Sequence, residues 1–179
     1  GPWAEEKYRY VVIYAELFAT GMKNQWKRRV YLDLFSGPGH SQIRGTPRVV
    51  LGSPLIALDL PDPFDAYIFA DESPGSVAAL KARVDRAGHA SKVSIITGDA
   101  NENVTEIAKL IAGPGGGRSL SFCFLDPFKL NVHFETVRKL ADGRDMDFVI
   151  LLALYVDANR NIKSYIRDES PTIDRFLGD

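Results

Sequence analysis

Short apolar runs alternate with helical patterns along this chain, and that alternation limits what it can fold into. The apolar runs fall at 30–35, 66–70, 93–97, 120–125 and 148–154. Helical patterns precede or separate them at 4–23, 55–60, 102–112 and 132–141, with a further helix that ends at Gly88. Strands that alternate with helices form a mostly parallel sheet with helices on both faces. The sequence therefore predicts one α/β domain over residues 4–179.

Serine–proline pairs and polar segments predict where the elements begin and end. Ser53-Pro54 and Ser73-Pro74 each predict a helix start, with the serine as N-cap and the proline at the first helical position. Residues 40–52 are polar and punctuated by glycine, so we expect a surface loop there. The basic group 27–29 is interpreted as a solvated connector between helix and strand, with phosphate contact as the alternative.

Overall charge and cysteine content narrow the classes of function. The 179 residues carry a formal net charge of −1 and a pI near 6.4, which gives no support to a nucleic-acid partner but is compatible with a local basic patch. The single cysteine, Cys123, cannot form an intrachain disulfide, so a cytoplasmic location is expected. No apolar run reaches the roughly 18 residues of a membrane span. The three histidines are scattered, and no metal site is expected.

The residues that could carry chemistry stand where the predicted strands end. Ligands of open parallel sheets bind outside the carboxyl ends of the strands, where the strand order reverses. The first four strands end, in turn, in a glycine turn, an acid, an acid, and an acid–proline–aromatic triplet: Gly37 and Gly39, Asp71, Asp99, and Asp126-Pro127-Phe128. Each residue alone has a plain explanation as a turn or helix-start residue. Their succession favours a nucleotide-binding site.

Four sequence motifs carry a family resemblance. The segments DLFSGPG (33–39), ADESPGSVAAL (70–80), IITGDANENV (95–104) and FLDPF (124–128) resemble the first four motifs of Rossmann-like S-adenosylmethionine-dependent methyltransferases. Together with GSPLIAL (52–58) and FLDPFKL (124–130), they are similar to the three-Cys-motif partner family, TcmP. The resemblance runs from about residue 5 to the C-terminus.

The resemblance implies a cofactor, S-adenosyl-L-methionine, and a set of site residues. The first motif would border the methionine part, Asp71 would hold the ribose hydroxyls with Glu72 beside it, and Asp99 and Ala100 would border the adenine. The implied cofactor-binding residues are Asp33, Phe35, Ser36, Gly37, Gly39, Asp71, Glu72, Asp99 and Ala100. The implied catalytic residues, which would face the methyl acceptor, are Asp126, Pro127 and Phe128.

Two features depart from the family pattern. Amino-methylating enzymes have two prolines between the acid or amide and the aromatic, whereas Pro127 stands alone here, which puts specificity for a base in doubt. A complete methyltransferase sheet has seven strands, and the sequence predicts five before Asp179. We therefore expect the C-terminal strands to be missing from this chain.

Three functions are compatible with these motifs. The first is methyl transfer to a nitrogen of a nucleic-acid base. The second, from another class, is a non-catalytic protein that binds S-adenosylmethionine and acts beside a three-Cys-motif partner protein. The third is a dinucleotide-dependent oxidoreductase, which is disfavoured because no third glycine follows Gly39 at the required spacing.

Overall fold

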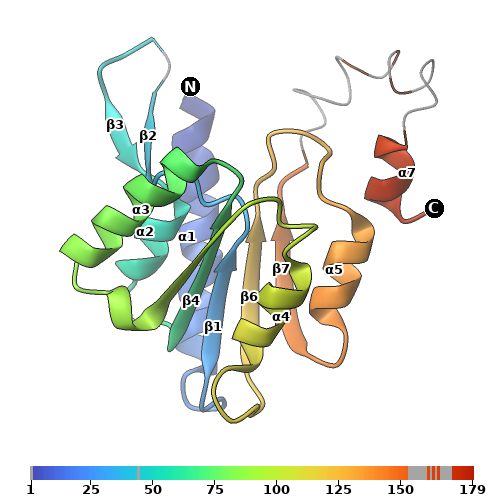
Figure 1. The fold of residues 1–179 in the computed structure, drawn as a ribbon. Coiled ribbons are helices and arrows are strands. Elements are labelled where there is room, and N and C mark those ends of the chain that lie inside the picture. The colour runs from blue at the N-terminus through green and yellow to red at the C-terminus, as the bar shows by residue number, and fades with distance from the viewer. Residues whose placement is uncertain (1, 44, 153–160, 162, 164, 166–170) are drawn as a thin grey trace.

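A computed structural model describes the chain except for residue 1, residue 44 and residues 153–160, 162, 164 and 166–170. Its centre is a five-stranded parallel sheet in the order β5-β4-β1-β6-β7 (Figure 1). The strands are β1 (Arg29–Asp33), β4 (Ala66–Asp71), β5 (Val93–Thr97), β6 (Leu120–Leu125) and β7 (Asp145–Ile150). In chain order this is the 3-2-1-4-5 arrangement of doubly wound α/β folds. The predicted Rossmann-like fold is confirmed.

Helices cover both faces of the sheet (Figure 1). On one face lie α1 (Pro2–Met22), α2 (Ser53–Leu58) and α3 (Pro74–Arg86), and on the other α4 (Val104–Ala112) and α5 (Phe134–Ala141). The remaining elements are a short hairpin of β2 (His40–Gln42) and β3 (Val49–Leu51), the 3-10 turn η1 (Ala90–Lys92), and α7 (Thr172–Leu177), which contacts α5. None of the described helices combines the length and the apolar character that a membrane span requires.

Alternation along each strand builds two different cores. In β1, Tyr31 faces α1–α3, whereas Val30 and Leu32 face α4 and α5, and all three are fully buried. The first core is aromatic: Tyr31 lies within 5.4 Å of the ring centroids of both Phe64 and Phe122. The second core is aliphatic and contains the buried Cys123. Burial on both faces explains why the strands read as continuous apolar runs.

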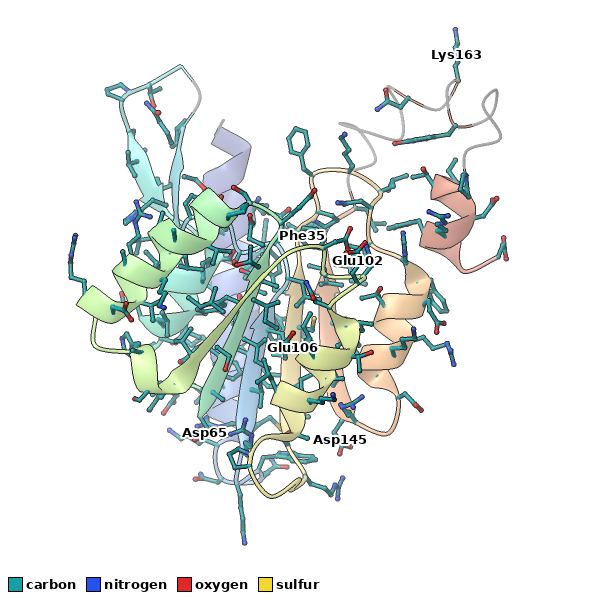
Figure 2. The ribbon with its side chains drawn as sticks, in the orientation of Figure 1. Phe35, Asp65, Glu102, Glu106, Asp145 and Lys163 are labelled. Carbon is teal, nitrogen blue, oxygen red and sulfur yellow. The ribbon has the colours of Figure 1, made fainter. Side chains whose placement is uncertain are left out.

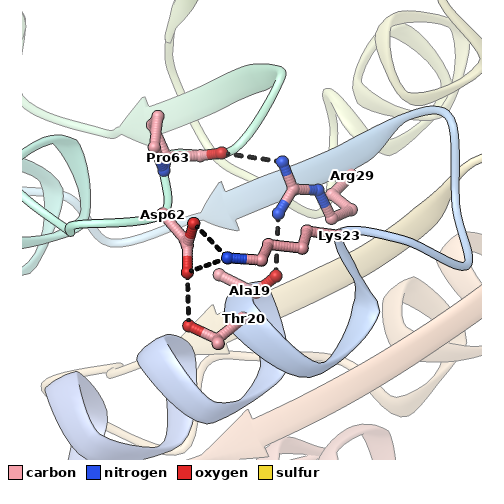
Figure 3. Close-up of polar contacts among 6 residues, drawn as sticks. All are labelled: Ala19, Thr20, Lys23, Arg29, Asp62 and Pro63. Carbon is pink, nitrogen blue, oxygen red and sulfur yellow. Dashed lines mark hydrogen bonds and ion pairs between the residues drawn. The ribbon is translucent and has the colours of Figure 1, made fainter.

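Arg29 anchors the amino end of the sheet (Figure 3). Its guanidinium donates to the Ala19 carbonyl at 2.7 Å and to the Pro63 carbonyl at 3.0 Å, and only 8% of the residue is exposed. This joins the end of α1 to the segment before β4. The prediction of a solvated connector at 27–29 is therefore wrong for Arg29, which is the buried first residue of β1.

Four other predicted boundaries can be compared with the structure. Ser73 caps α3 as predicted, because its hydroxyl accepts from the Ser76 amide at 3.3 Å. The N-cap of α2 is Gly52 and not Ser53, since the helix begins one residue earlier than expected.

The loop predicted at 40–52 contains the β2–β3 hairpin. The fifth strand spans Asp145–Ile150 and not 148–154, because its pairing with β6 starts at Asp145, a polar position that the apolar run excluded; residues 153 and 154 lie outside the described part.

Candidate cofactor and acceptor site

The strand order reverses between β1 and β6, and most of the predicted site residues lie around this point. The chain runs from β1 outward through β4 to β5, then returns to pair β6 on the other side of β1. Asp33, the last residue of β1, is paired with Phe124 of β6, so Asp126 follows two residues beyond it at the same end of the sheet. Figure 2 shows Phe35 at this carboxyl end, opposite Asp65 and Asp145. Ligands of doubly wound folds bind at such a switch point.

The turn after β1 is held by backbone and side-chain hydrogen bonds to the end of β4. Both the amide and the hydroxyl of Ser36 donate to the Ala70 carbonyl, at 3.0 and 3.1 Å. Gly37 has a φ of +59°, and a side chain built there would meet no atom within 4 Å. A left-handed residue beside open space is where a backbone can approach a ligand closely. The geometry thus gives Gly37 both of the features that its predicted role requires.

Gly39 has a packing explanation of its own. A Cβ at this position would lie 2.9 Å from a methyl group of Leu80 and 3.1 Å from the Leu55 side chain, and φ is +82°. Its carbonyl also accepts from the Gly52 amide at 2.8 Å. Gly39 therefore allows the turn to pack against α2 and α3, and a contact with the cofactor stays a prediction.

Asp71 joins two backbone segments around the turn. One carboxylate oxygen accepts from the Gly37 amide at 2.8 Å and the other from the Ser73 amide at 2.9 Å. Each oxygen can still accept a further hydrogen bond, because a carboxylate has about four lone-pair sites. Glu72 next to it is exposed. The acid that the sequence assigned to the ribose thus also shapes the glycine turn, which sequence reasoning did not anticipate.

The loop after β5 fixes the loop after β6. The Asp99 carboxylate accepts from the Asn101 amide at 2.6 Å, and Ala100 is buried. The Asn101 side-chain oxygen accepts from the His133 amide at 2.9 Å and the Thr136 hydroxyl at 2.7 Å, and its NH2 group donates to the Asn131 carbonyl at 2.8 Å. Asn101 therefore clamps the segment that follows Phe128. The sequence analysis missed this residue, although it stands within the third motif.

Asp33 is a buried acid with an unused acceptor. It is fully buried; Oδ1 accepts from the Phe35 amide at 3.2 Å, and Oδ2 has no hydrogen-bond partner. The pKa of Asp33 is raised to about 7, chiefly by burial and also by the negative charge of Asp126. The nearby Ser53 hydroxyl and the Phe35 amide act in the opposite direction and lower this pKa. A buried acceptor without a partner at a switch point is a position where a ligand donor or cation fits.

Asp126 forms an ion pair with Lys7. The Lys7 ammonium contacts Asp126 Oδ2, and the two side chains are only 17% and 25% exposed. Pro127 is buried, whereas Phe128 is 77% exposed. Phe128 therefore does not pack into the sheet. Sequence reasoning missed Lys7, and no sequence signal points to it, because it lies in α1, 119 residues before its partner.

No group of three or more His, Cys, Asp or Glu side chains that could hold a metal ion occurs among the residues that the structure describes. His40 lies in β2, and His133 precedes α5 as its N-cap. A cavity of about 360 Å³ is lined by Ile111, Gly117 and Arg144, near the amino ends of β6 and β7, and is separate from the switch point.

Comparison with known proteins gives distant structural similarity alone. No family model matches the chain, and no curated protein matches it. A conserved hypothetical protein of Streptococcus pyogenes is 15% identical, with a TM-score of 0.44 over 74% of this chain and 69% of that one. A Legionella pneumophila protein of the DUF519 family is 14% identical, with a TM-score of 0.46 over 72% of this chain; the chain spans only 58% of that protein's length. The assignment to the Rossmann-like α/β fold follows from the parallel sheet order.

Proposed function

We propose that this chain binds S-adenosylmethionine at the β1–β6 switch point and transfers its methyl group to a nitrogen of a nucleic-acid base. The observation that carries the proposal is the meeting of Asp33, the open Gly37 turn and Asp126 at the carboxyl ends of adjacent strands. This is the place where the fold binds nucleotide ligands. The four motifs supply the family resemblance that names the cofactor.

The residues around the turn suit a cationic nucleoside. When bound, S-adenosylmethionine supplies an electrophilic methyl group on a positively charged sulfonium. The unpartnered Asp33 Oδ2 could accept from the amino group of the methionine part, and Gly37 lets the backbone approach it. Asp71 keeps acceptor capacity for the ribose hydroxyls. Asp99 and Ala100, at the end of β5, would border the adenine.

The acceptor side would be formed by the end of β6. Asp126 would orient the acceptor amine or take its proton. Both roles require a carboxylate oxygen within hydrogen-bond distance of that amine. The exposed ring of Phe128 offers a flat surface on which an unpaired base can stack. Pro127, which is buried, fixes the chain between these two residues.

Calorimetry with three ligands tests the cofactor assignment. We expect the purified protein to bind S-adenosylmethionine and S-adenosylhomocysteine, and not NAD. Binding of NAD alone would replace the proposal with the oxidoreductase alternative. If the protein binds neither S-adenosylmethionine nor S-adenosylhomocysteine, the proposed function is wrong.

A non-catalytic, cofactor-binding role beside a three-Cys-motif protein is the second candidate. One observation favours it: Pro127 stands alone where amino-methylating enzymes have two prolines. Incubation with radiolabelled S-adenosylmethionine and DNA or RNA, with and without a three-Cys-motif protein, separates the two. Cofactor binding without label transfer under both conditions would favour the non-catalytic role.

A further inference from the structure

Two carboxylates and one ammonium meet at the switch point. Asp33 ends β1, Asp126 follows the adjacent β6, and Lys7 reaches them from α1. The first turns of α1 lie at the carboxyl end of the sheet, together with the β2–β3 hairpin and the loop after β6 (Figure 1). Lys7 is therefore a cation held at the site by an element that none of the four motifs includes.

The neighbouring Tyr8 helps to fix Lys7 at this place. Its ammonium lies 4.6 Å from the ring centroid of Tyr8, a distance at which cation and ring attract. The Tyr8 hydroxyl is 3.5 Å from the Ser41 hydroxyl of β2, which ties the same turn of α1 to the hairpin. The Lys7 side chain thus contacts the Tyr8 ring in addition to Asp126, and Tyr8 in turn contacts the hairpin.

The ion pair affects the site through charge and geometry. The Lys7 ammonium restrains the partly buried Asp126 carboxylate. Removal of the ammonium would leave the negative charge of Asp126 uncompensated. The charge of Lys7 also reaches the buried Asp33, whose pKa it lowers while Asp126 raises it. Lys7 thus offsets the repulsion between two acids on neighbouring strands.

We infer that Lys7 is a positioning residue of this site, which holds the Asp126 carboxylate toward the acceptor and balances the charge of Asp33. The inference rests on the proposed function for the role of Asp126 in transfer. The electrostatic link among Lys7, Asp126 and Asp33 does not depend on it. One set of variants can therefore test the electrostatic link and the role in methyl transfer separately.

The variants are Lys7→Met, Lys7→Arg and Lys23→Met. Methionine keeps the length of the side chain without its charge, and Lys7 borders an apolar groove with Val11 and Val149 in which a thioether is tolerated. Lys23→Met is the matched control, because Lys23 lies at the other end of the α1 segment and pairs with Asp62 at 2.9 Å, away from the site (Figure 3). Arginine at position 7 keeps the charge.

The first measurement is NMR titration of the Asp33 carboxyl carbon, which needs no substrate. We expect Lys7→Met to raise the Asp33 pKa above its value of about 7 and Asp126→Asn to lower it. Lys7→Arg and Lys23→Met should leave it nearly unchanged. An Asp33 titration that is the same in Lys7→Met and the wild type would overturn the inference.

The second measurement is methyl transfer to RNA or DNA from S-adenosylmethionine. At saturating S-adenosylmethionine, we expect Lys7→Met to lower kcat at least tenfold, with partial rescue by Lys7→Arg and wild-type rates for Lys23→Met. Lys7→Met should add little to the loss caused by Asp126→Asn. A kcat near wild type in Lys7→Met would overturn the positioning role. Wild-type protein that transfers no methyl group would instead count against the proposed function, and the Asp33 titration would then decide on Lys7.

Discussion

The Asp71 carboxylate accepts a hydrogen bond from the Gly37 amide at 2.8 Å, and this contact joins the ends of two neighbouring strands. The same carboxylate accepts from the Ser73 amide with its other oxygen. An acid assigned to the ribose thus also sets the shape of the turn beside the proposed cofactor. Its replacement would affect binding through a lost contact and through a loosened turn.

Asp71→Ala is expected to weaken S-adenosylmethionine binding at least tenfold, whereas Glu72→Ala has little effect. Hydrogen bonds to a charged acceptor contribute roughly 1.5–3 kcal/mol each, and about 1.4 kcal/mol corresponds to a tenfold change in affinity. Glu72 is exposed and is the matched control. Calorimetric Kd values check the expectation. Equal effects of the two variants would mean that the ribose contact is misplaced.

Asp33→Asn is expected to change the pH dependence of stability. The pKa of Asp33 is about 7 in the folded protein against 3.8 in the unfolded chain, chiefly because of burial. Below pH 3.8 both states are protonated and no penalty exists. As the pH rises toward 7 the unfolded state ionises first, so the folded state loses stability, by an amount on the order of 4 kcal/mol above pH 7.

Asparagine does not titrate, so the gain in melting temperature of Asp33→Asn over wild type should be larger at pH 8 than at pH 4. Asp62→Asn is a control of opposite sign, because Lys23 and Thr20 lower the pKa of Asp62 and its contribution is lost as the pH falls. Parallel melting curves for wild type and Asp33→Asn across this range would show that Asp33 ionises normally.

Phe128→Ala is expected to weaken acceptor binding without destabilising the fold. The ring is 77% exposed, so its removal costs little packing, while base–aromatic stacking contributes about 1–3 kcal/mol per base. The measurement is the KM for single-stranded RNA or DNA together with the melting temperature. Phe128→Tyr, which keeps the ring, should retain the wild-type KM. An unchanged KM in Phe128→Ala would show that the ring does not contact the acceptor.

Asn101→Ala is expected to destabilise the protein by about 2–3 kcal/mol. Three hydrogen bonds join this side chain to the segment after Phe128, and each contributes about 1 kcal/mol net. Asn103→Ala is the control, because its side chain makes one long bond of 3.5 Å to the Thr97 carbonyl. Denaturant unfolding measures both variants. A loss in Asn101→Ala no larger than in Asn103→Ala would show that the clamp is not rigid.

The strands and their approximate ends could be predicted from the sequence alone, for a local reason. Doubly buried parallel strands require continuous apolar runs, and each run here falls within a few residues of its strand, as Leu120–Leu125 does without any shift. The cap at Ser73 is equally local, since its hydroxyl reaches an amide three residues on. The fifth strand was misplaced because hydrogen bonding to β6, and not hydrophobicity, sets its start at Asp145.

The elements, the class of fold and the succession of polar residues at the strand ends follow from local sequence patterns. Which of these residues meet depends on how the strands and helices pack. The pairing of Asp33 with Phe124, the bond from Gly37 to Asp71 and the ion pair of Lys7 with Asp126 join positions 34 to 119 residues apart. Periodicity and capping report interactions within one or two turns of the chain, whereas the free energy of these contacts depends on how whole strands and helices pack.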